Sequence, residues 1–224
     1  MKTKTEDHAR AIVAKRKESE RHKRIATLMQ AAKQVFIAKG YDQASLREIA
    51  LAAEFTTGAI YVYFSGKAEL YGRILEQIMD MEISYLEEAA AVEGSILERL
   101  EAFAGAHIRF DIDFPEESAL LAKNLDALDL PTALRRRLDS KIAKSLSYIT
   151  DVIHQGIQKG FFPENLNKDE AAFLLFSATE GLSYTTTYGY SLEFEFDPLT
   201  LVKKAVRCLV SGMKANDETI NRQG

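Results

Sequence analysis

The chain has 224 residues, of which 46% are hydrophobic, enough to bury a sizeable core in one or two domains. No run approaches the ~18 apolar residues of a membrane-spanning helix, and the charged start lacks the apolar segment of a signal peptide. A single cysteine, Cys208, excludes a disulfide framework and a cysteine-based zinc site within one chain. We therefore expect a cytoplasmic protein without a membrane partner, and we expect Cys208 to be buried among apolar neighbours.

Charge is divided unevenly along the chain, although the net charge is only −4. Residues 1–75 carry 14 Lys and Arg against 8 Asp and Glu, a net of +6, whereas residues 76–224 carry a net of −10. A basic segment ahead of an acidic remainder is typical of a polyanion-binding module joined to a second function. A merely solvated charged surface is the alternative, and charge alone does not separate the two.

A first helix is predicted over residues 24–39, where apolar side chains recur at three- and four-residue spacing. Gly40 follows and is expected to end this helix in the left-handed conformation. Residues 1–23 are polar and carry a net charge of +4. They either extend the first helix or form a basic arm that adds non-specific affinity for a polyanion.

Two short helices are predicted between residues 45 and 64. Ser45 and Glu48 have the spacing of a capping box, which starts the first of them, and Thr56 or Thr57 caps the second. Their apolar residues are spaced to seal a small core with the preceding helix. The outer face or helix end then carries Arg47, Thr56, Thr57, Ala59, Tyr61 and Tyr63. A helix-turn-helix, which places its second helix in the major groove of DNA, has this arrangement.

The rest of the chain predicts longer helices with clear boundaries. Prolines at 115, 131 and 198 suit the first turn of a helix, and Asn167 to Glu170 resembles another capping box. The alternating run at 191–196 is short and isolated, so we expect a loop there. The predicted helices cover residues 67–91, 95–113, 115–128, 131–159, 168–188 and 198–214, and residues 215–224 are expected to fray.

The run from Arg24 to Leu70 resembles the DNA-binding domain of the TetR family of transcriptional regulators. The matching pieces are Lys39-Gly40-Tyr41, Ser45 to Ala50, Phe55 to Phe64, and Gly66 to Leu70. The resemblance implies an all-α fold with two parts. A three-helix, helix-turn-helix domain over residues 24–70 would be followed by a larger helical ligand-binding and dimerisation domain over residues 71–214.

The resemblance also implies roles for individual residues in binding double-stranded operator DNA. Arg47 is expected to contact a phosphate or a base edge, and Tyr61 and Lys67 are expected to contact phosphates. The N–H groups at Ser45 and at 56–58 can also hold phosphates at the helix ends. The positions that read bases in the family are occupied here by Thr57, Gly58, Ala59 and Tyr63.

Three positions depart from the commonest pattern of the family. Thr57 stands where lysine is frequent, Ala59 where threonine is frequent, and Val62 where histidine is frequent. These exchanges remove polar base contacts and leave room for apolar contact with thymine methyl groups.

The acidic body contains no recognised catalytic spacing, and its histidines are far apart in sequence. We therefore expect no metal site, no cofactor and no enzyme activity. In the family this region binds a small effector, and many phenylalanines at helical spacing favour a lipophilic one, such as a fatty-acyl compound, a drug-like aromatic or a quorum-type signal. A plain helical core is the alternative. The candidate pocket residues are Phe103, His107, Phe110, Leu121, Asn124, Ile149, Phe176 and Tyr184.

The last two long helices are expected to form a homodimer through a four-helix bundle. The candidate interface residues are Leu174, Ala178, Gly181, Leu182, Val202, Val206 and Leu209. Together these features predict a repressor that an effector releases from a palindromic operator. The alternative is a small helical enzyme or carrier in which residues 45–64 serve only as a packed cap.

Overall fold

The computed structural model describes residues 2–121, 125–185 and 196–214. In this part of the chain every regular element is a helix, which confirms the predicted all-α fold. The helices are α1 (Lys2–Gln43), α2 (Leu46–Ala52), α3 (Thr57–Tyr61), α4 (Lys67–Ala90), α5 (Ile96–Asp113), α6 (Pro115–Leu121), α7 (Thr132–Gln158), α8 (Lys168–Tyr184) and α9 (Pro198–Lys214), with a 3₁₀ turn at Leu125–Ala127.

The chain forms two compact units, whereas the sequence predicts a division after residue 70. Unit 1 comprises residues 1–75 together with 125–134, and unit 2 comprises residues 76–124 together with 135–224. Helix α4 therefore supplies its first turns to unit 1 and the remainder to unit 2. None of the helices in the described part of the chain has the length and apolar content needed to cross a membrane.

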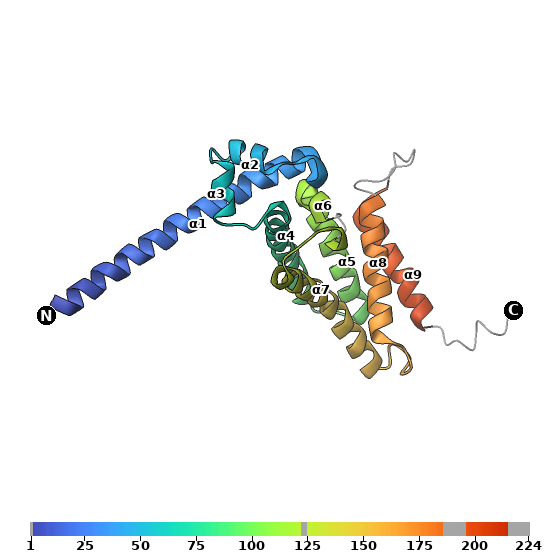
Figure 1. The fold of residues 1–224 in the computed structure, drawn as a ribbon. Coiled ribbons are helices and arrows are strands. Elements are labelled where there is room, and N and C mark those ends of the chain that lie inside the picture. The colour runs from blue at the N-terminus through green and yellow to red at the C-terminus, as the bar shows by residue number, and fades with distance from the viewer. Residues whose placement is uncertain (1, 122–124, 186–195, 215–224) are drawn as a thin grey trace. The chain divides into compact units, whose positions relative to one another are not determined.

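Helix α1 includes the basic segment, so of the two alternatives for residues 1–23 the structure shows a helical extension (Figure 1). Side chains at position 8 and at positions 10–23 are exposed, and Arg16 pairs with Glu20 at 3.0 Å one turn further along. Gly40 has φ 73° and ψ 166°, which interrupts the helix as predicted. The backbone therefore changes direction at Gly40 before the helix-turn-helix begins.

The core of unit 1 is made by α1, α2, α3 and the start of α4. Phe36 packs edge-to-face against Tyr71 with ring centroids 4.9 Å apart, and Ile49 and Ile60 are fully buried. The packing at Gly72 is close, because a Cβ at that position would lie 2.8 Å from side-chain atoms of both Leu130 and Leu134, which would have to shift. The segment 125–134 thus packs directly on the backbone of α4.

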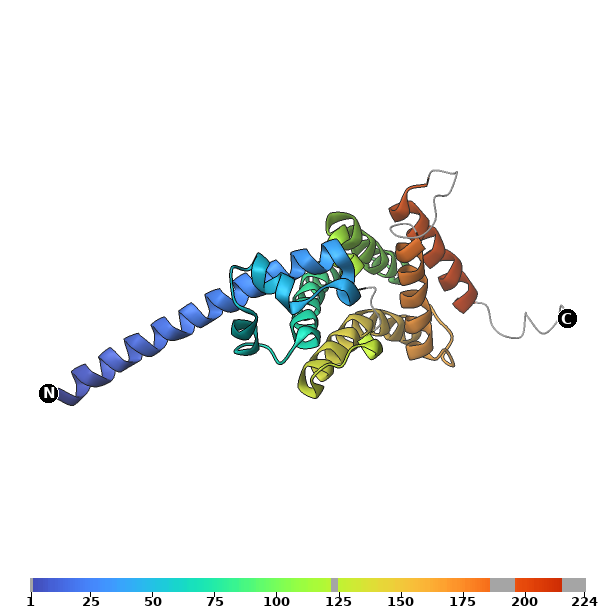
Figure 2. The same cartoon turned by 45° about the horizontal axis from the view of Figure 1, so that its top comes forward.

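Unit 2 is organised around α5. Helix α9 makes the most extensive contact with α5, and α8 packs on both of them. Figures 1 and 2 show α8 and α9 running side by side. Ion pairs from Glu76 to Arg137, Asp80 to Lys141 and Glu87 to Lys144 join α4 to α7. Each such surface pair contributes little alone, but three in succession define one register between the two helices.

The helix boundaries differ from the sequence predictions at two places. Helix α6 ends at Leu121 instead of about residue 128, and a short 3₁₀ turn follows at Leu125–Ala127. Helix α8 is described to Tyr184, so the predicted extension to 188, most of the predicted loop at 191–196 and the predicted frayed tail at 215–224 lie outside the described residues.

Candidate nucleic-acid interface and ligand pocket

Helix α2 begins with the predicted capping box. The Ser45 hydroxyl accepts the Glu48 N–H at 3.3 Å, and the Glu48 carboxylate accepts the Ser45 N–H at 3.0 Å. Lys39 also donates to Glu48, and the bonds from Lys39 and Ser45 lower the pKa of Glu48 to about 2. Both donors of Ser45 are therefore engaged by Glu48, and a phosphate at this helix end would have to compete with them.

Helix α3 starts at a side-chain cap from Thr56, whose hydroxyl accepts the Ala59 N–H at 3.2 Å. The turn before it is tight, with Glu54 in the left-handed region at φ 59°. Glu54 at this position lets the chain reverse between α2 and α3 within four residues, which separates the two helices as a helix-turn-helix requires.

An open groove runs between α2 and the start of α3. Of the predicted DNA-binding residues, it brings together Ser45, Arg47, Thr56 and Thr57. Among the others, Gly58 and Tyr61 are exposed, whereas Ala59 and Tyr63 are half-buried. The groove also contains Leu51, which is 79% exposed and which periodicity alone did not mark as functional.

Lys67 points inward in this structure, although the resemblance assigns it to a phosphate. Its ammonium donates to the carbonyls of Tyr41 at 2.8 Å, Ala44 at 3.1 Å and Asp42 at 3.4 Å, and it lies 4.4 Å from the centre of the Tyr41 ring. An ammonium has three N–H donors, so these carbonyls use all of them. Lys67 therefore caps the C-terminal end of α1, where carbonyls lack helical partners.

Unit 2 contains a small, mostly apolar cavity between α4, α5, α7, α8 and α9. Its volume is about 20 Å³, room for roughly one water molecule. Four of the predicted pocket residues line it: Phe103, His107, Ile149 and Phe176. The lining also includes residues that the sequence did not single out: Glu82, Leu86, Leu100, Ala104, Ser145, Leu175, Thr179 and Val206.

The other predicted pocket residues do not line this cavity. Phe110 is fully buried in the core, where it packs against Tyr85 and Phe114. Leu121 is half-buried at the end of α6, and Tyr184 is 59% exposed on α8. Asn124 lies outside the described residues. Phe110 and His107 both lie on α5, but they face different parts of the core. His107 faces the cavity, whereas Phe110 faces Tyr85 and Phe114.

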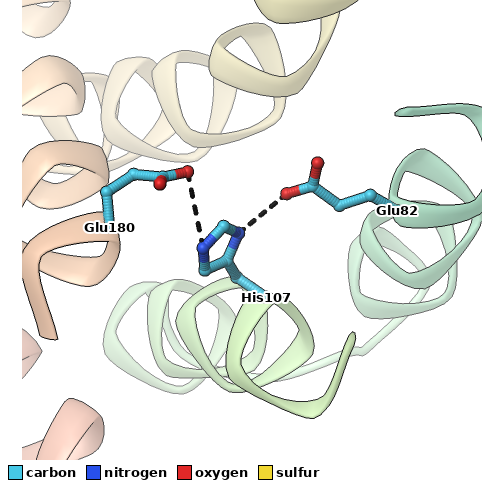
Figure 3. A group of neighbouring side chains, drawn as sticks. All are labelled: Glu82, His107 and Glu180. Carbon is cyan, nitrogen blue, oxygen red and sulfur yellow. Dashed lines mark hydrogen bonds and ion pairs between the residues drawn. The ribbon is translucent and has the colours of Figure 1, made fainter. Parts of the chain in front are cut away.

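A buried histidine stands at the polar side of this cavity (Figure 3). The Nδ1 atom of His107 is 2.7 Å from Oε1 of Glu82, and Nε2 is 3.4 Å from Oε1 of Glu180 and 3.6 Å from Oδ2 of Asp111. An ionised carboxylate can only accept a hydrogen bond, so Nδ1 of His107 is protonated and donates its N–H to Glu82. Burial opposes the charged form of His107, but the Glu82 hydrogen bond and the Glu180, Glu82 and Asp111 charges outweigh it and raise its pKa to about 9.

The carboxylates around His107 come from three helices, and two of them have their own constraints. Asp111 on α5 is 3% exposed and accepts hydrogen bonds from the hydroxyls of Ser118 and Ser183. Glu180 on α8 is only partly covered, with 47% of its side chain exposed. Burial and the charges of Glu82 and Asp111 raise the pKa of Glu180, and they outweigh the lowering effect of the His107 charge. Only Asp111, four residues after His107, had a sequence signal.

The predicted dimer residues separate into two groups. Val202 and Val206 are 1% and 2% exposed because the inner face of α9 packs in the core. The prediction that they lie in the dimer interface is therefore wrong. Leu182 and Leu209 are partly buried against the same core. On the outer face of α8, Leu174 is 55% exposed, Gly181 is exposed and Ala178 is half-buried, and Phe173 beside them is 59% exposed.

Cys208 is exposed on α9, in contrast to the prediction that it is buried. Its neighbours Val206 and Val210 face the core instead. Helix α9 is amphipathic, and Cys208 lies on its exposed side.

Known proteins share both parts of this architecture. Residues 28–74 match the family model described as "Bacterial regulatory proteins, tetR family". The chain is 23% identical over 186 residues to the fatty acid metabolism regulator protein of Bacillus subtilis (strain 168), which covers 83% of this chain and 93% of that protein. It is also 23% identical over 175 residues to the regulator TtgR of Pseudomonas putida, covering 76% and 83%.

Solved structures have the same fold. FadR from Bacillus subtilis, in complex with stearoyl-CoA, superposes with a TM-score of 0.67 at 21% identity, covering 84% of this chain and 98% of that chain. AibR, in complex with isovaleryl coenzyme A and operator DNA, superposes with a TM-score of 0.65 at 18% identity, covering 84% and 98%.

A capped helix-turn-helix followed by a helical body with a buried pocket defines a ligand-responsive, DNA-binding transcriptional regulator. Its N-terminal region carries the DNA-binding domain described for the tetR family of bacterial regulatory proteins. The relatives and structural neighbours are regulators, so the alternative of a helical enzyme or carrier has no support among them.

The position of Lys67 leads to a specific expectation for its substitution. Lys67→Met removes the donor for three carbonyls and should lower the free energy of unfolding by ~1–3 kcal/mol. Thermal unfolding followed by circular dichroism measures this loss. Lys23→Met, which removes a charge from an exposed position of α1, is the control. If Lys67→Met left stability unchanged but flattened the salt dependence of DNA binding, the phosphate role would hold instead.

Proposed function

We propose that the protein is a repressor that binds a palindromic operator through α2 and α3 and leaves it when a small lipophilic effector enters unit 2. The observation that carries the proposal is the pairing of an exposed, partly basic helix-turn-helix groove with a separate, mainly apolar pocket in one chain. Helix α4 contributes to both units, because it begins next to the helix-turn-helix and contains the pocket residues Glu82 and Leu86.

The proposed DNA contacts follow from exposure. Arg47 is exposed in the groove and is free of the capping network that engages Ser45, so it can reach a phosphate or a base edge. Tyr61 is 59% exposed, which allows its hydroxyl to meet a phosphate. Leu51 and Val62, at 79% and 72% exposure, offer apolar surface for thymine methyl groups. This face therefore offers a cation, a hydroxyl and apolar groups to the major groove.

The proposed effector is an acyl thioester or a compound of similar lipophilicity. One structural neighbour is described with stearoyl-CoA and another with isovaleryl coenzyme A. The cavity of about 20 Å³ is too small for either acyl chain, so binding would have to separate the helices that line it. An effector that binds only the opened state would shift the position of α4 and weaken DNA binding by a coupling free energy of ~1–3 kcal/mol.

The proposed dimer uses the outer face of α8. Phe173, Leu174 and Tyr184 are each more than half exposed there, and Gly181 lies between them, with no atom within 4 Å of the position its Cβ would take. Small residues between large apolar ones allow two helices to approach closely. A second copy of α8 and α9 would cover this face and form a four-helix bundle with two-fold symmetry.

Operator binding should depend on Arg47 through a phosphate or base contact. Arg47→Ala should weaken binding to the DNA upstream of the protein's own gene and flatten the dependence of log K on log salt by ~0.9 if one phosphate contact is lost. Fluorescence anisotropy over a salt series measures both. Arg136→Ala on α7 removes the same charge from the body and should change neither. Equal affinity and equal slope for Arg47→Ala and the native protein would remove Arg47 from the interface.

The pocket should be the effector site. Ser145 lines the cavity from α7, and Ser147, two residues later, is exposed. Ser145→Leu should fill the cavity, so that operator binding persists but stearoyl-CoA or isovaleryl-CoA no longer releases the DNA. Ser147→Leu should respond like the native protein. An unaltered response of Ser145→Leu would place the effector elsewhere, and no response of the native protein would exclude these thioesters.

Dimerisation should depend on the outer face of α8. Leu174→Glu introduces a charge into the proposed interface and should yield monomers with much weaker operator binding, as measured by sedimentation velocity and anisotropy. The matched control is Ile112→Glu on α5, because Ile112 is similarly exposed at 53%. A native protein that sediments as a monomer, or a Leu174→Glu variant that remains dimeric, would contradict this arrangement.

A further inference from the structure

One imidazole, that of His107, contacts three carboxylates in unit 2. Glu82, Asp111 and Glu180 each form an ion pair with His107, at 2.7, 3.6 and 3.4 Å. His107 is 9% exposed and Asp111 is 3% exposed, so most of this group is removed from water. One imidazolium supplies at most one positive charge, which leaves the group with an excess of negative charge that a low-dielectric interior penalises. A divalent cation that displaces the proton of one ring nitrogen would raise the net charge of the group by one and so relieve part of this excess.

The atoms are also close enough together to share one ion. One oxygen of Glu82, one nitrogen of His107 and one oxygen of Glu180 all lie within 4.8 Å of one another (Figure 3). Ligands bound to one zinc ion at ~2.0–2.2 Å stand ~3–4 Å apart. Shifts of about an ångström at the ends of two flexible glutamate side chains would therefore complete the coordination.

The cavity provides a second, independent observation. Glu82 and His107 line it directly, and its volume of about 20 Å³ has room for an ion or a single water molecule without any movement of the helices. Water within the cavity could supply the fourth ligand of a tetrahedral site. Asp111, held in place by Ser118 and Ser183, adds a nearby negative charge that favours a cation.

We propose that Glu82, His107 and Glu180 bind a divalent transition-metal ion of the zinc class. An imidazole nitrogen with two carboxylates is a borderline donor set that suits zinc and its neighbours, whereas magnesium and calcium prefer oxygen alone. The ion would join α4, α5 and α8, since each contributes one ligand. This inference goes beyond the proposed function, because it concerns metal binding by the protein alone and holds whether or not an organic effector exists.

The test is a zinc titration of the full-length, tag-free protein after removal of metal with a chelator. Isothermal calorimetry should show one Zn²⁺ bound per chain, and thermal unfolding should show a raised melting temperature with Zn²⁺ but not with Mg²⁺. Substituting Co²⁺ should give visible absorption bands of a bound ion. Absence of saturable binding at one ion per chain would overturn the proposal without bearing on DNA binding.

Variants decide which residues bind the ion. Glu180→Gln should weaken zinc binding tenfold or more, and it is the variant least disruptive to folding because Glu180 stands at the rim with 47% of its side chain exposed. Glu82→Gln should have the same effect. The matched controls are Glu87→Gln on α4 and His154→Gln on α7, both exposed residues outside the cluster, which should bind zinc like the native protein. Native affinity in both Glu180→Gln and Glu82→Gln would overturn the assignment of the site.

Discussion

The structure of unit 2 depends on the burial of α5. Eleven of the 18 residues of this helix are buried, and three of the eleven, Glu101, His107 and Asp111, are ionisable. Each ionisable group buried in this way needs a partner, because an unpaired buried charge costs ~3–5 kcal/mol. Glu101 pairs with Arg207 of α9 at 2.6 Å, and Asp111 is bonded by Ser183 of α8. The polar residues of α5 thus determine which helices surround it and in which register.

The same requirement explains the chemistry of the pocket. The side of α5 that bears His107 faces carboxylates from α4 and α8, whereas Ile108 and Phe110 of the same helix are buried in the core. The small cavity lies beside His107 and Glu82, and apolar side chains such as Phe103 and Leu86 form most of its remaining lining.

In unit 1 the constraint is the opposite one, because DNA binding needs exposed residues on a rigid frame. The capping box at Ser45 and the Thr56 cap satisfy N–H groups at the starts of α2 and α3, and Lys67 satisfies the carbonyls at Tyr41, Asp42 and Ala44. These polar side chains are used for structure. The exposed surface of α2 and α3 is therefore a mixture of Arg47 with apolar and hydroxyl groups, which fits the departures of this chain from the commonest family pattern.

Local signals were sufficient for much of the fold. The Ser45–Glu48 capping box, the left-handed Gly40 and the helix starts at residues 115 and 198 each depend on residues within one turn, so the sequence alone determined them. Contacts between residues far apart in the sequence were decided by the tertiary structure. Hydrophobic periodicity shows that Val202 and Phe110 are buried but not which neighbour covers them, and here it is the chain's own core. Glu82 and Glu180 meet His107 from helices far apart in the sequence, because only the packing of α4 and α8 on α5 brings their charges to one imidazole.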